Sequence, residues 1–580
     1  MGSIENPPSP SDNMAKQWWK EGSVYQIYPA SFMDSNNDGM GDIAGVTSKL
    51  GYIEALGVDI IWLSPHYDSP QVDMGYDVSD YEKVYPPYGT MGDMDNLIKE
   101  THARGMRIIV DLVINHTSSE HAWFQESRSS KDNPKRDWYI WRPARYDENG
   151  QRMPPNNWRS MFCGSAWTWD EHTQEYYLHL FATEQPDLNW ESQEARKAIY
   201  ESSMEFWLRK GVDGFRIDCV NMYSKDGLND APVIDSTTFL QDAGLTFCNG
   251  PRMHEYLDEM SNVLSKYDTM TVGECPFTPD RNQVLSYVSA DVNRLNMVFQ
   301  FDVVETGTSH AGKFRHAPPS DWLLQFKAAV TRTQQLINDT NGWTTTYLEN
   351  HDWSRSISRF GSGAPKYREA SGKMLALMLA SLSGTLFIYQ GQEIGMINAP
   401  DSWSIDEFKD LDAKNYYNEV REQTSGNPEV LQGALERIRF IARDNARTPM
   451  QWNAKRNAGF SESAEPWMRV IDGYEMINAE AQEHDKESVL WFWRRMLKLR
   501  KEHADVLVYG SFEPLDLEDA ETFCFSKTWK DKQAIIMLNF TKRERQMPLK
   551  KLEVAELLVS SVEKPVDSLA AFEGRIYLRK

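Results

Sequence analysis

The sequence has little of what marks several large protein classes. It holds five cysteines in 580 residues, an odd number at wide spacing and without a Cys-x-x-Cys pair. That pattern indicates neither a disulfide framework nor a zinc site. No run approaches the roughly 18 apolar residues that span a membrane. Residues 1–20 are polar and rich in Pro and Ser, without the apolar stretch of a signal peptide. We therefore expect no membrane association and a reducing, cytoplasmic setting.

Positive charge is also scarce. Lys and Arg number 62 against 85 Asp and Glu, which gives a net charge of −23. A nucleic-acid partner requires a basic surface, and anionic membranes attract polybasic segments. The charge therefore disfavours nucleic acid, membranes and acidic substrates. A neutral small molecule is compatible with it. Oligomeric state is not readable, and we expect a monomer with a dimer as the alternative.

Apolar, β-branched runs alternate with helical segments along most of the chain. Such alternation predicts parallel strands with right-handed crossovers, and eight units predict a (β/α)₈ TIM barrel, an α/β fold. The expected strands are Val24–Tyr28, Asp59–Leu63, Arg107–Val113, Gly214–Ile217, Met270–Val272, Asn296–Phe301, Thr344–Leu348 and Thr385–Tyr389.

Three stretches depart from this alternation. Residues 117–192 are rich in Trp, Pro, Asn and Arg and are too long for a simple loop. Residues 400–453 form a second excursion after the eighth strand. Short strands that begin near Val506–Tyr509 predict a C-terminal antiparallel β-sandwich. We expect a catalytic barrel over 1–116 and 193–509, an inserted small domain over 117–192 after strand three, and a C-terminal domain over 510–580.

Three acidic residues each follow a short β-like run. Asp218 ends Gly-Phe-Arg-Ile-Asp, Glu274 ends Thr-Val-Gly-Glu, and Asp352 ends Leu-Glu-Asn-His-Asp. Carboxyl groups on different strand ends converge only at a shared barrel mouth. Paired carboxyl groups around one sugar carbon are the usual machinery for cleaving a glycosidic bond. The acids therefore predict a glycoside-cleaving site.

The neighbours of these acids suggest a division of roles. Arg216 lies two residues before Asp218, so both side chains share one face of the strand. A structural salt bridge is one interpretation; the other is that Arg216 keeps Asp218 ionised as a nucleophile. Glu274 in an apolar mouth should have a raised pKa, which suits a general acid.

Four short blocks, together with two further segments, resemble the signature segments of the α-amylase superfamily, glycoside hydrolase family 13. They stand in the family's order, and the resemblance covers nearly the whole chain. It is strongest for the oligo-1,6-glucosidase subfamily, which contains maltases and isomaltases. The segments are Asp111–His116, Gly214–Asn221, Gly273–Pro276, Leu348–Asp352, Gln185–Trp190 and Arg443–Trp452.

The resemblance implies a retaining, exo-acting α-glucosidase that releases glucose from short α-glucosides of the maltose, sucrose or isomaltose type. Asp218 would be the nucleophile, Glu274 the acid and base, and Asp352 the stabiliser of the transition state. Substrate-binding roles are implied for a further set, in which Asp77 and Arg443 would hold the 4-hydroxyl of the terminal glucose and Tyr76 would stack under its ring. The set is Tyr76, Asp77, His116, Arg216, Cys219, His351 and Arg443.

Asp34–Asp42 carries a different pattern. Oxygen ligands recur at alternate positions with Gly39 at the sixth, as in a calcium loop, although Gly45 replaces the bidentate Glu of an EF-hand. A metal-free turn stabilised by Asp and Asn side chains is the alternative. Subfamily relatives hold one calcium at such a loop, which favours a structural Ca²⁺ and no organic cofactor. The implied ligands are Asp34, Asn36, Asp38, the Met40 carbonyl and Asp42.

The preferred linkage stays open. Within the subfamily, Val after the nucleophile accompanies α-1,6 specificity, and Thr or Ala accompanies α-1,4 cleavage, but this chain has Cys219. Pro276 replaces the Gln that isomaltases carry two residues after the acid. Both departures favour maltose-type substrates. An isomaltase, and a glucosyl-transferring or sucrose-isomerising enzyme, are the enzymatic alternatives. An inactive transporter subunit is the non-enzymatic one, although such proteins need a membrane anchor and lose the carboxylates.

Overall fold

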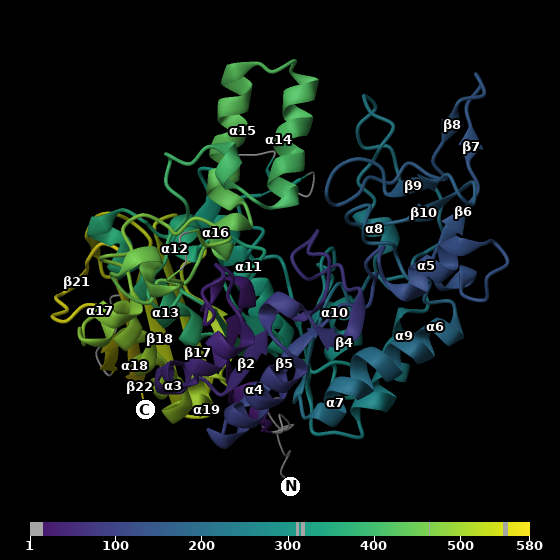
Figure 1. Ribbon diagram of the computed structural model, residues 1–580. Helices are drawn as coiled ribbons and strands as arrows, with labels where there is room; N and C mark the ends of the chain where they lie inside the picture. Colours follow the sequence, from purple (N-terminus) through teal and green to yellow (C-terminus); the bar gives the residue numbers. More distant parts are fainter. Residues whose placement is uncertain (1–15, 309–311, 315–318, 463–464, 549–554, 580) are drawn as a thin grey trace, which may run out of the picture.

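The computed structural model describes residues 16–308, 312–314, 319–462, 465–548 and 555–579. Its centre is an eight-stranded parallel sheet in the order β13-β12-β11-β5-β2-β1-β15-β14 (Figure 1). All eight expected strands are present. They are β1 Ser23–Ile27, β2 Ile60–Leu63, β5 Arg107–Leu112, β11 Gly214–Ile217, β12 Met270–Glu274, β13 Met297–Phe299, β14 Thr345–Thr346 and β15 Thr385–Tyr389.

Side chains join the two ends of this sheet. The Thr345 hydroxyl donates to the Val298 carbonyl over 3.2 Å, and the Thr344 hydroxyl donates to Gln300 Oε1 over 2.9 Å. Because β14 is only two residues long, these bonds replace a full backbone ladder between β13 and β14. The closed barrel brings the carboxyl ends of the strands to one face, as the fold class requires.

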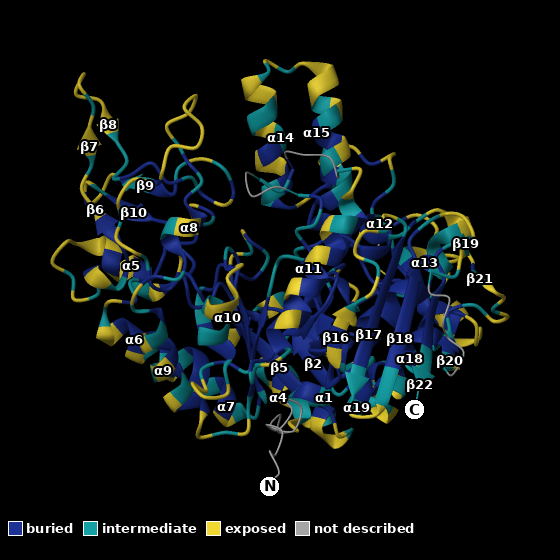
Figure 2. Cartoon of the chain, turned by 180° about the vertical axis from the view of Figure 1, so that it is seen from behind, coloured by how far each residue is buried: buried dark blue, intermediate teal, exposed yellow. Residues whose placement is uncertain are grey.

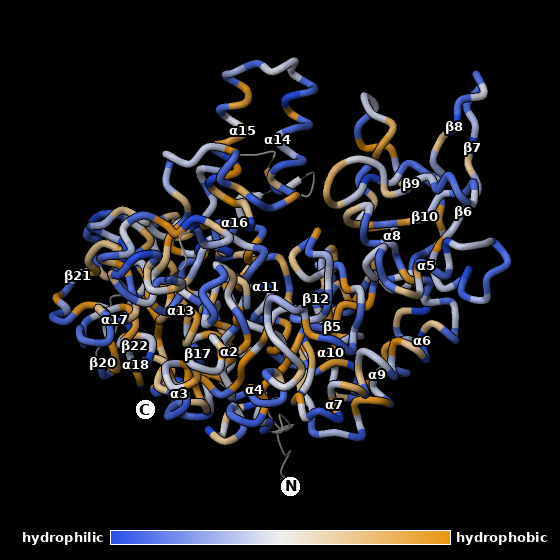
Figure 3. Tube along the Cα trace, in the orientation of Figure 1, coloured by the Kyte–Doolittle hydropathy of each residue, from blue (hydrophilic) through white to orange (hydrophobic). Residues whose placement is uncertain are grey.

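Helices surround the barrel and begin and end where their sequences specify. Thr90 and Asp93 form a capping box at the start of α4, and Gly57 ends α3 with a φ of 98°, which a residue without Cβ adopts at little cost. The barrel helices are α2 Ile43–Ser48, α3 Leu50–Leu56, α4 Met91–Ala103, α6 Gln193–Ile199, α7 Phe206–Lys210, α9 Met253–Leu264, α10 Arg281–Val288, α11 Trp322–Ile337, α12 Ser356–Phe360, α13 Pro365–Ser381 and α18 Val489–Glu502. Apolar residues concentrate in the central strands, whereas the projecting loops are largely hydrophilic (Figure 3).

The stretch between β5 and α6 forms its own small sheets. Helix α5 Ala122–Ser129 precedes a three-stranded antiparallel sheet of β6 Trp141–Arg142, β9 Trp167–Asp170 and β10 Glu175–Leu178, with a hairpin of β7 Arg145–Tyr146 and β8 Arg152–Met153. Part of the chain after β11 packs on it: Trp158 Nε1 donates to the Asn229 carbonyl over 2.9 Å. The apolar cluster of the insert also contains Cys219, Met222 and Phe247. The insert is thereby fastened beside the end of β11.

Two helices rise beside the insert (Figure 1). They are α14 Leu411–Gln423 and α15 Pro428–Ile441. The pair contacts the insert directly: Arg159 Nη2 forms an ion pair with Glu419 at 2.6 Å, and Asn415 Nδ2 donates to the Phe162 carbonyl over 3.0 Å. The second excursion of the sequence is therefore a helical hairpin that shares the barrel mouth with the insert.

The chain ends in a five-stranded antiparallel sheet, as expected. Its order is β16-β17-β18-β22-β20, and it lies beside the barrel (Figure 2). One expectation was wrong: Val506–Tyr509 is no strand, because α19 Ala504–Leu507 covers its first half and a turn follows. Its strands are β16 Ser511–Pro514, β17 Thr522–Trp529, β18 Lys532–Asn539, β20 Glu556–Ser560 and β22 Gly574–Arg579. No helix in the described ranges is long and apolar enough to cross a membrane.

Candidate active site

The strand ends open into a cavity of about 280 Å³ at the barrel mouth. One part of its lining, here called the polar side, consists of Asp73, Tyr76, His116, Asp218, Glu274, Asp352 and Arg443. The other part, here called the aromatic side, consists of Phe162, Phe181, Phe277, Phe301, Phe314, Trp353 and Tyr416. The three acids predicted from strand ends therefore do meet in one cavity.

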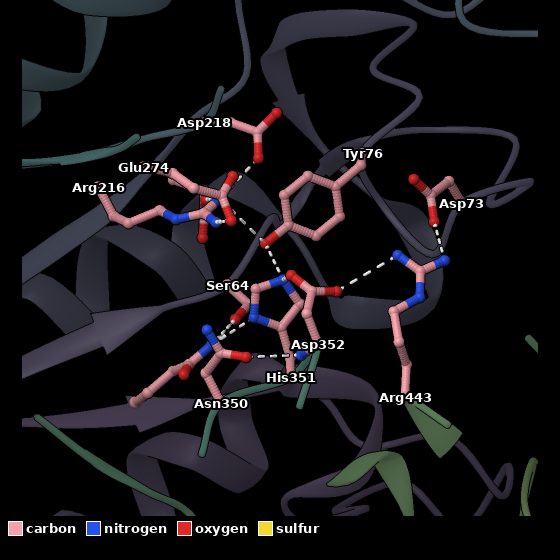
Figure 4. Close-up of polar contacts among 12 residues, drawn as sticks. Ser64, Asp73, Tyr76, Arg216, Asp218, Glu274, Asn350, His351, Asp352 and Arg443 are labelled. Atoms are coloured by element: carbon pink, nitrogen blue, oxygen red, sulfur yellow. Dashed lines mark hydrogen bonds and ion pairs between the residues drawn. The ribbon is translucent and has the colours of Figure 1, made fainter. Parts of the chain in front are cut away.

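Arg216 organises the acids on the polar side (Figure 4). Its side chain is 1% exposed, and its Nη1 lies 2.7 Å from Asp218 Oδ1 while its Nη2 lies 2.9 Å from Glu274 Oε1. The same Nη1 lies 2.7 Å from Asp111 Oδ1. Arg216 therefore forms a buried salt bridge and also fixes the orientation of both catalytic candidates. Asp111, at the end of β5, is the third anionic partner of Arg216, and the sequence did not predict this contact.

The two carboxyl groups differ in proton affinity. Burial raises the pKa of Glu274 to about 8, against the opposing pull of the Arg216 guanidinium. Burial also raises the pKa of Asp218, but only to about 6, again with Arg216 opposing. At neutral pH Glu274 therefore carries a proton and Asp218 is mostly ionised. This is the protonation state that a proton donor and a nucleophile need.

The spacing of the same two groups sets the stereochemistry. One carboxylate oxygen of Asp218 lies within 4.8 Å of one of Glu274. Retaining glycosidases hold their carboxyl groups about 5–5.5 Å apart, whereas inverting ones leave roughly 6.5–9.5 Å for a water molecule. A contact this short is on the retaining side of that division and suits direct attack by Asp218.

Asp352 contacts one histidine and two guanidinium groups. Its Oδ2 is 2.9 Å from His351 Nε2, and its Oδ1 is 3.3 Å from Arg443 Nη1 and 3.1 Å from Arg447 Nη2. Burial by itself would raise the pKa of Asp352, but His351, Arg443 and Arg447 outweigh it and hold the pKa well below its usual value. Asp352 is therefore a permanent anion, suited to stabilising positive charge rather than to carrying a proton.

Tyr76 and His116 line the polar side, whereas His351 is fully buried and packs against Tyr76 outside the cavity lining. Gln26 Nε2 lies 2.8 Å from His351 Nδ1, so donation from this amide places the ring proton on Nε2, which faces Asp352. The rings of Tyr76 and His351 are nearly parallel, at 3° with centroids 5.1 Å apart. His116 Nε2 contacts the Tyr76 carbonyl at 3.0 Å. Burial lowers the pKa of both histidines, to about 4 for His351, so both rings are neutral.

Asp77 was assigned to the sugar-binding set on resemblance, and the structure does not bring it to the cavity. Its carboxylate is fully buried in its own loop and accepts hydrogen bonds from Ser69 Oγ and from the amides of Val72 and Asp73. Asp73 takes the expected position instead, 2.9 Å from Arg443 Nη2.

The turn between the two aspartates decides which of them faces the cavity. Met74 and Gly75 have φ values of 44° and 98°, which reverse the chain so that Asp73 and Tyr76 face the cavity together. The sequence shows only two aspartates four residues apart and does not reveal this reversal. Asp410 was also missed; it binds Arg443 Nε and Nη2 at 2.5 and 2.6 Å.

Cys219 lies between the polar side and the insert. Its φ is 46°, a left-handed conformation that is uncommon outside glycine, and its amide donates to Glu274 Oε2 over 3.3 Å. The thiol is 5% exposed and lines the cavity. Pro276 lines the same cavity. The residues that the sequence singled out for linkage preference are therefore all in reach of a substrate.

The predicted calcium loop lies outside the cavity lining. Asp34 accepts hydrogen bonds from the amides of Asn37 and Gly39, and Asp42 accepts one from Gly45 at the start of α2. The loop also binds the segment after η7 Arg456–Gly459, because the Trp467 amide donates to the Gly39 carbonyl over 2.8 Å. Its donors are all carboxylate, amide or carbonyl oxygens, which fits a hard cation such as Ca²⁺.

Comparison with known proteins agrees with this geometry. The family model described as alpha amylase, catalytic domain, matches residues 26–510. An α-glucosidase of Candida albicans is 52% identical over 568 residues, which cover 97% of this chain and 99% of that protein. An oligo-1,6-glucosidase of Saccharomyces cerevisiae is 49% identical over 579 residues, with 97% and 98% coverage.

Solved structures of proteins that are named for other activities have the same fold. The isomaltulose synthase of Klebsiella sp. LX3 superimposes with a TM-score of 0.90 at 38% identity, covering 97% of this chain and all of that one. A trehalose-6-phosphate hydrolase of Bacillus licheniformis superimposes with a TM-score of 0.89 at the same identity and coverage.

Proposed function

This chain belongs to the alpha-amylase family, and on that premise we propose that it is a retaining, exo-acting α-glucosidase. The observation that carries the proposal is the pair of buried carboxyl groups, Asp218 and Glu274, held by one guanidinium at a separation suited to retention. Their different pKa values favour a nucleophile and an acid in the same cavity.

The reaction has two steps. In the first, an Asp218 oxygen attacks the anomeric carbon while Glu274 gives its proton to the departing glycosidic oxygen, so the leaving alcohol is neutral and a β-glucosyl ester forms. In the second, the ionised Glu274 takes a proton from water, the water oxygen attacks the same carbon, and the ester bond to Asp218 breaks. Asp352 stabilises the positive charge that develops on the sugar in both steps.

The proposal that the enzyme attacks chain ends rests on the charged groups around Arg443. Arg443 forms ion pairs with both Asp73 and Asp352 and is itself held by Asp410. These charged groups suit the hydroxyl groups of a terminal glucose, which supports attack at chain ends. We therefore place Asp73, rather than Asp77, beside Arg443 in the binding of the terminal sugar.

Maltose-type substrates are the favoured class. Cys219 is close in volume to Thr, and Pro276 offers no side-chain amide to a leaving sugar. Short α-glucosides of the sucrose or isomaltose type remain alternatives, since a methylene-sized difference changes discrimination only about 10–200-fold. Glucosyl transfer or sucrose isomerisation is a second candidate, favoured by the likeness to the isomaltulose synthase. Against it, the α-glucosidase relative is more similar, at 52% against 38% identity.

One experiment separates these activities. Initial rates on maltose, isomaltose, sucrose and trehalose would be measured while NMR follows the anomer of the first product. We expect α-glucose from all cleaved substrates and the highest kcat/KM on maltose. Initial β-glucose would refute retention, and conversion of sucrose to an isomer without glucose release would favour the second candidate.

Three further properties are proposals. Ca²⁺ would be held by the loop Asp34–Asp42 in a structural role, as its all-oxygen donor set suggests. Metal analysis of purified protein should then find about one Ca²⁺ per chain. A cytoplasmic setting is supported by five unpaired cysteines, all of which lie in the described part of the chain. A monomer is expected, and sedimentation would test it.

A further inference from the structure

Beside the nucleophile, one thiol and two carboxylates share a face of the cavity. One ligand atom each from Asp218, Cys219 and Glu274 lies within 4.8 Å of the other two. All three residues are buried, and all three line the cavity. The reaction outlined above uses the carboxylates and gives no task to the thiol.

We propose that these three residues form a binding site for a thiophilic divalent cation, Zn²⁺, which blocks the substrate. Zinc takes Cys sulfur at about 2.3 Å and carboxylate oxygen at about 2.0–2.2 Å in tetrahedral geometry, so its sulfur and oxygen ligands lie ~3.5 Å apart. Cys219 Sγ lies 3.7 Å from Glu274 Oε2. The third ligand comes from Asp218, and cavity water completes the fourth position, as in open zinc sites.

Arg216 orients the two carboxylate ligands of this site and leaves the site itself free. Its contacts are to Oδ1 of Asp218 and Oε1 of Glu274, whereas Oε2 of Glu274 is the oxygen beside the thiol. The guanidinium therefore fixes both carboxylates and leaves one oxygen of each for a second partner. Zn²⁺ uptake converts the Cys219 thiol to a thiolate and the Glu274 carboxylic acid to a carboxylate, and it releases both protons to the buffer, so no oxidant or other reactant is needed.

The backbone sets the direction of the thiol. Cys219 has a φ of 46°, and its amide donates to the same Glu274 oxygen over 3.3 Å. The Cβ–Sγ bond is thereby held toward Glu274. A hard cation is a poor match, because Ca²⁺ takes six to eight oxygen ligands and this face offers two carboxylates and a sulfur. The site is therefore chemically distinct from the Asp34–Asp42 loop.

The experiment has two independent measurements on the full chain. In the first, maltose hydrolysis is measured at several Zn²⁺ concentrations, and we expect Zn²⁺ to raise the apparent KM without changing kcat. In Cys219→Val we expect the Zn²⁺ inhibition constant to rise at least about tenfold, since one of three protein ligands is lost. Cys163→Ser, which removes a cavity thiol outside the set, should keep the original inhibition constant. Ca²⁺ at the same concentrations should leave KM unchanged.

The second measurement needs no activity, so it stands even if the proposed α-glucosidase function fails. Cd²⁺ is titrated as a probe, and its thiolate charge-transfer absorption is followed in the ultraviolet. We expect the absorption band to saturate at one equivalent of Cd²⁺ per chain. The band should persist in Cys163→Ser and be absent in Cys219→Val. An unchanged band or an unchanged Zn²⁺ inhibition constant in Cys219→Val would overturn the site, as would non-competitive inhibition.

Discussion

The polar and aromatic sides of the cavity are held together by different forces. On the polar side every acid has a fixed cationic or hydrogen-bonding partner: Arg216 holds Asp218 and Glu274, and Arg443 holds Asp73. The aromatic side relies on ring contacts, such as Tyr416 stacked on Phe314 with centroids 4.9 Å apart. Charged networks tolerate little change, because one lost partner leaves a buried charge unpaired. Ring surfaces tolerate change in the size and shape of what they contact.

The two sides also come from different parts of the chain. The acids stand at the ends of barrel strands β11 and β12 and just beyond β14. The rings come from loops, the insert and the helical hairpin, for example Phe162 and Tyr416. The difference teaches that the acids proposed for the reaction stand on the barrel, whereas part of the ring surface around them comes from the excursions.

The largest effect should come from the nucleophile on the polar side. Asp218→Asn removes the attacking anion, and we expect kcat/KM on maltose to fall at least about ten-thousand-fold. The fold should survive, since Arg216 keeps Asp111 and Glu274 as partners. Thermal unfolding is the control. A folded Asp218→Asn enzyme with near-normal turnover would refute the assignment of Asp218 as the nucleophile.

The second largest effect should distinguish the role of Asp73 from that of Asp77. Asp73→Asn breaks a buried ion pair with Arg443, and truncating such a pair costs about 2–5 kcal/mol, so we expect kcat/KM to fall roughly 10²–10³-fold. Asp77→Asn is the matched control: it should keep kcat/KM within about threefold and lose about 1–3 kcal/mol of stability, because its hydrogen bonds are internal to the loop. The reverse ranking would restore Asp77 to the sugar site.

The pH dependence tests the polar side without mutation. Asp218 must be ionised and Glu274 protonated, so kcat/KM should be bell-shaped, with limbs near pH 6 and pH 8. Activity should fall about tenfold per pH unit beyond each limb. Because the two groups share Arg216, the limbs report the pair as a whole. An optimum well below pH 5 would contradict a protonated Glu274 as the acid.

The smallest effect should appear where the two sides meet. Cys219→Val adds bulk beside the nucleophile, and we expect the ratio of kcat/KM on isomaltose to that on maltose to rise about tenfold. Cys219→Ser changes polarity with little change in size and serves as the control, with a ratio within about threefold of the original. An unchanged ratio in Cys219→Val would contradict this role of Cys219 and would assign the linkage preference to the aromatic side.

The sequence predicted the features that depend on residues close together in the chain. Alternating strands and helices predicted the barrel, and Asp218 and Glu274 were recognisable because each ends an apolar strand. It failed where an irregular turn decides direction. The resemblance assigned Asp77 to the sugar site and Asp73 was not considered, and the positive φ values at Met74 and Gly75 that turn Asp73 toward the cavity have no simple sequence signature. Asp410 was missed because it comes from an excursion whose path back over the barrel mouth depends on tertiary packing.

The sequence by itself determined the barrel, the order of its strands and the three acids at strand ends, because hydrophobic periodicity and strand length are local properties. Only the tertiary structure decided which groups surround those acids. A pKa depends on burial and on charges within a few ångströms, wherever they stand in the chain. Arg216 serves three carboxylates from three strands, and Arg443 reaches Asp73 from 370 residues away. These contacts give similar carboxyl groups the different charge states that the proposed nucleophile, acid and fixed anion require.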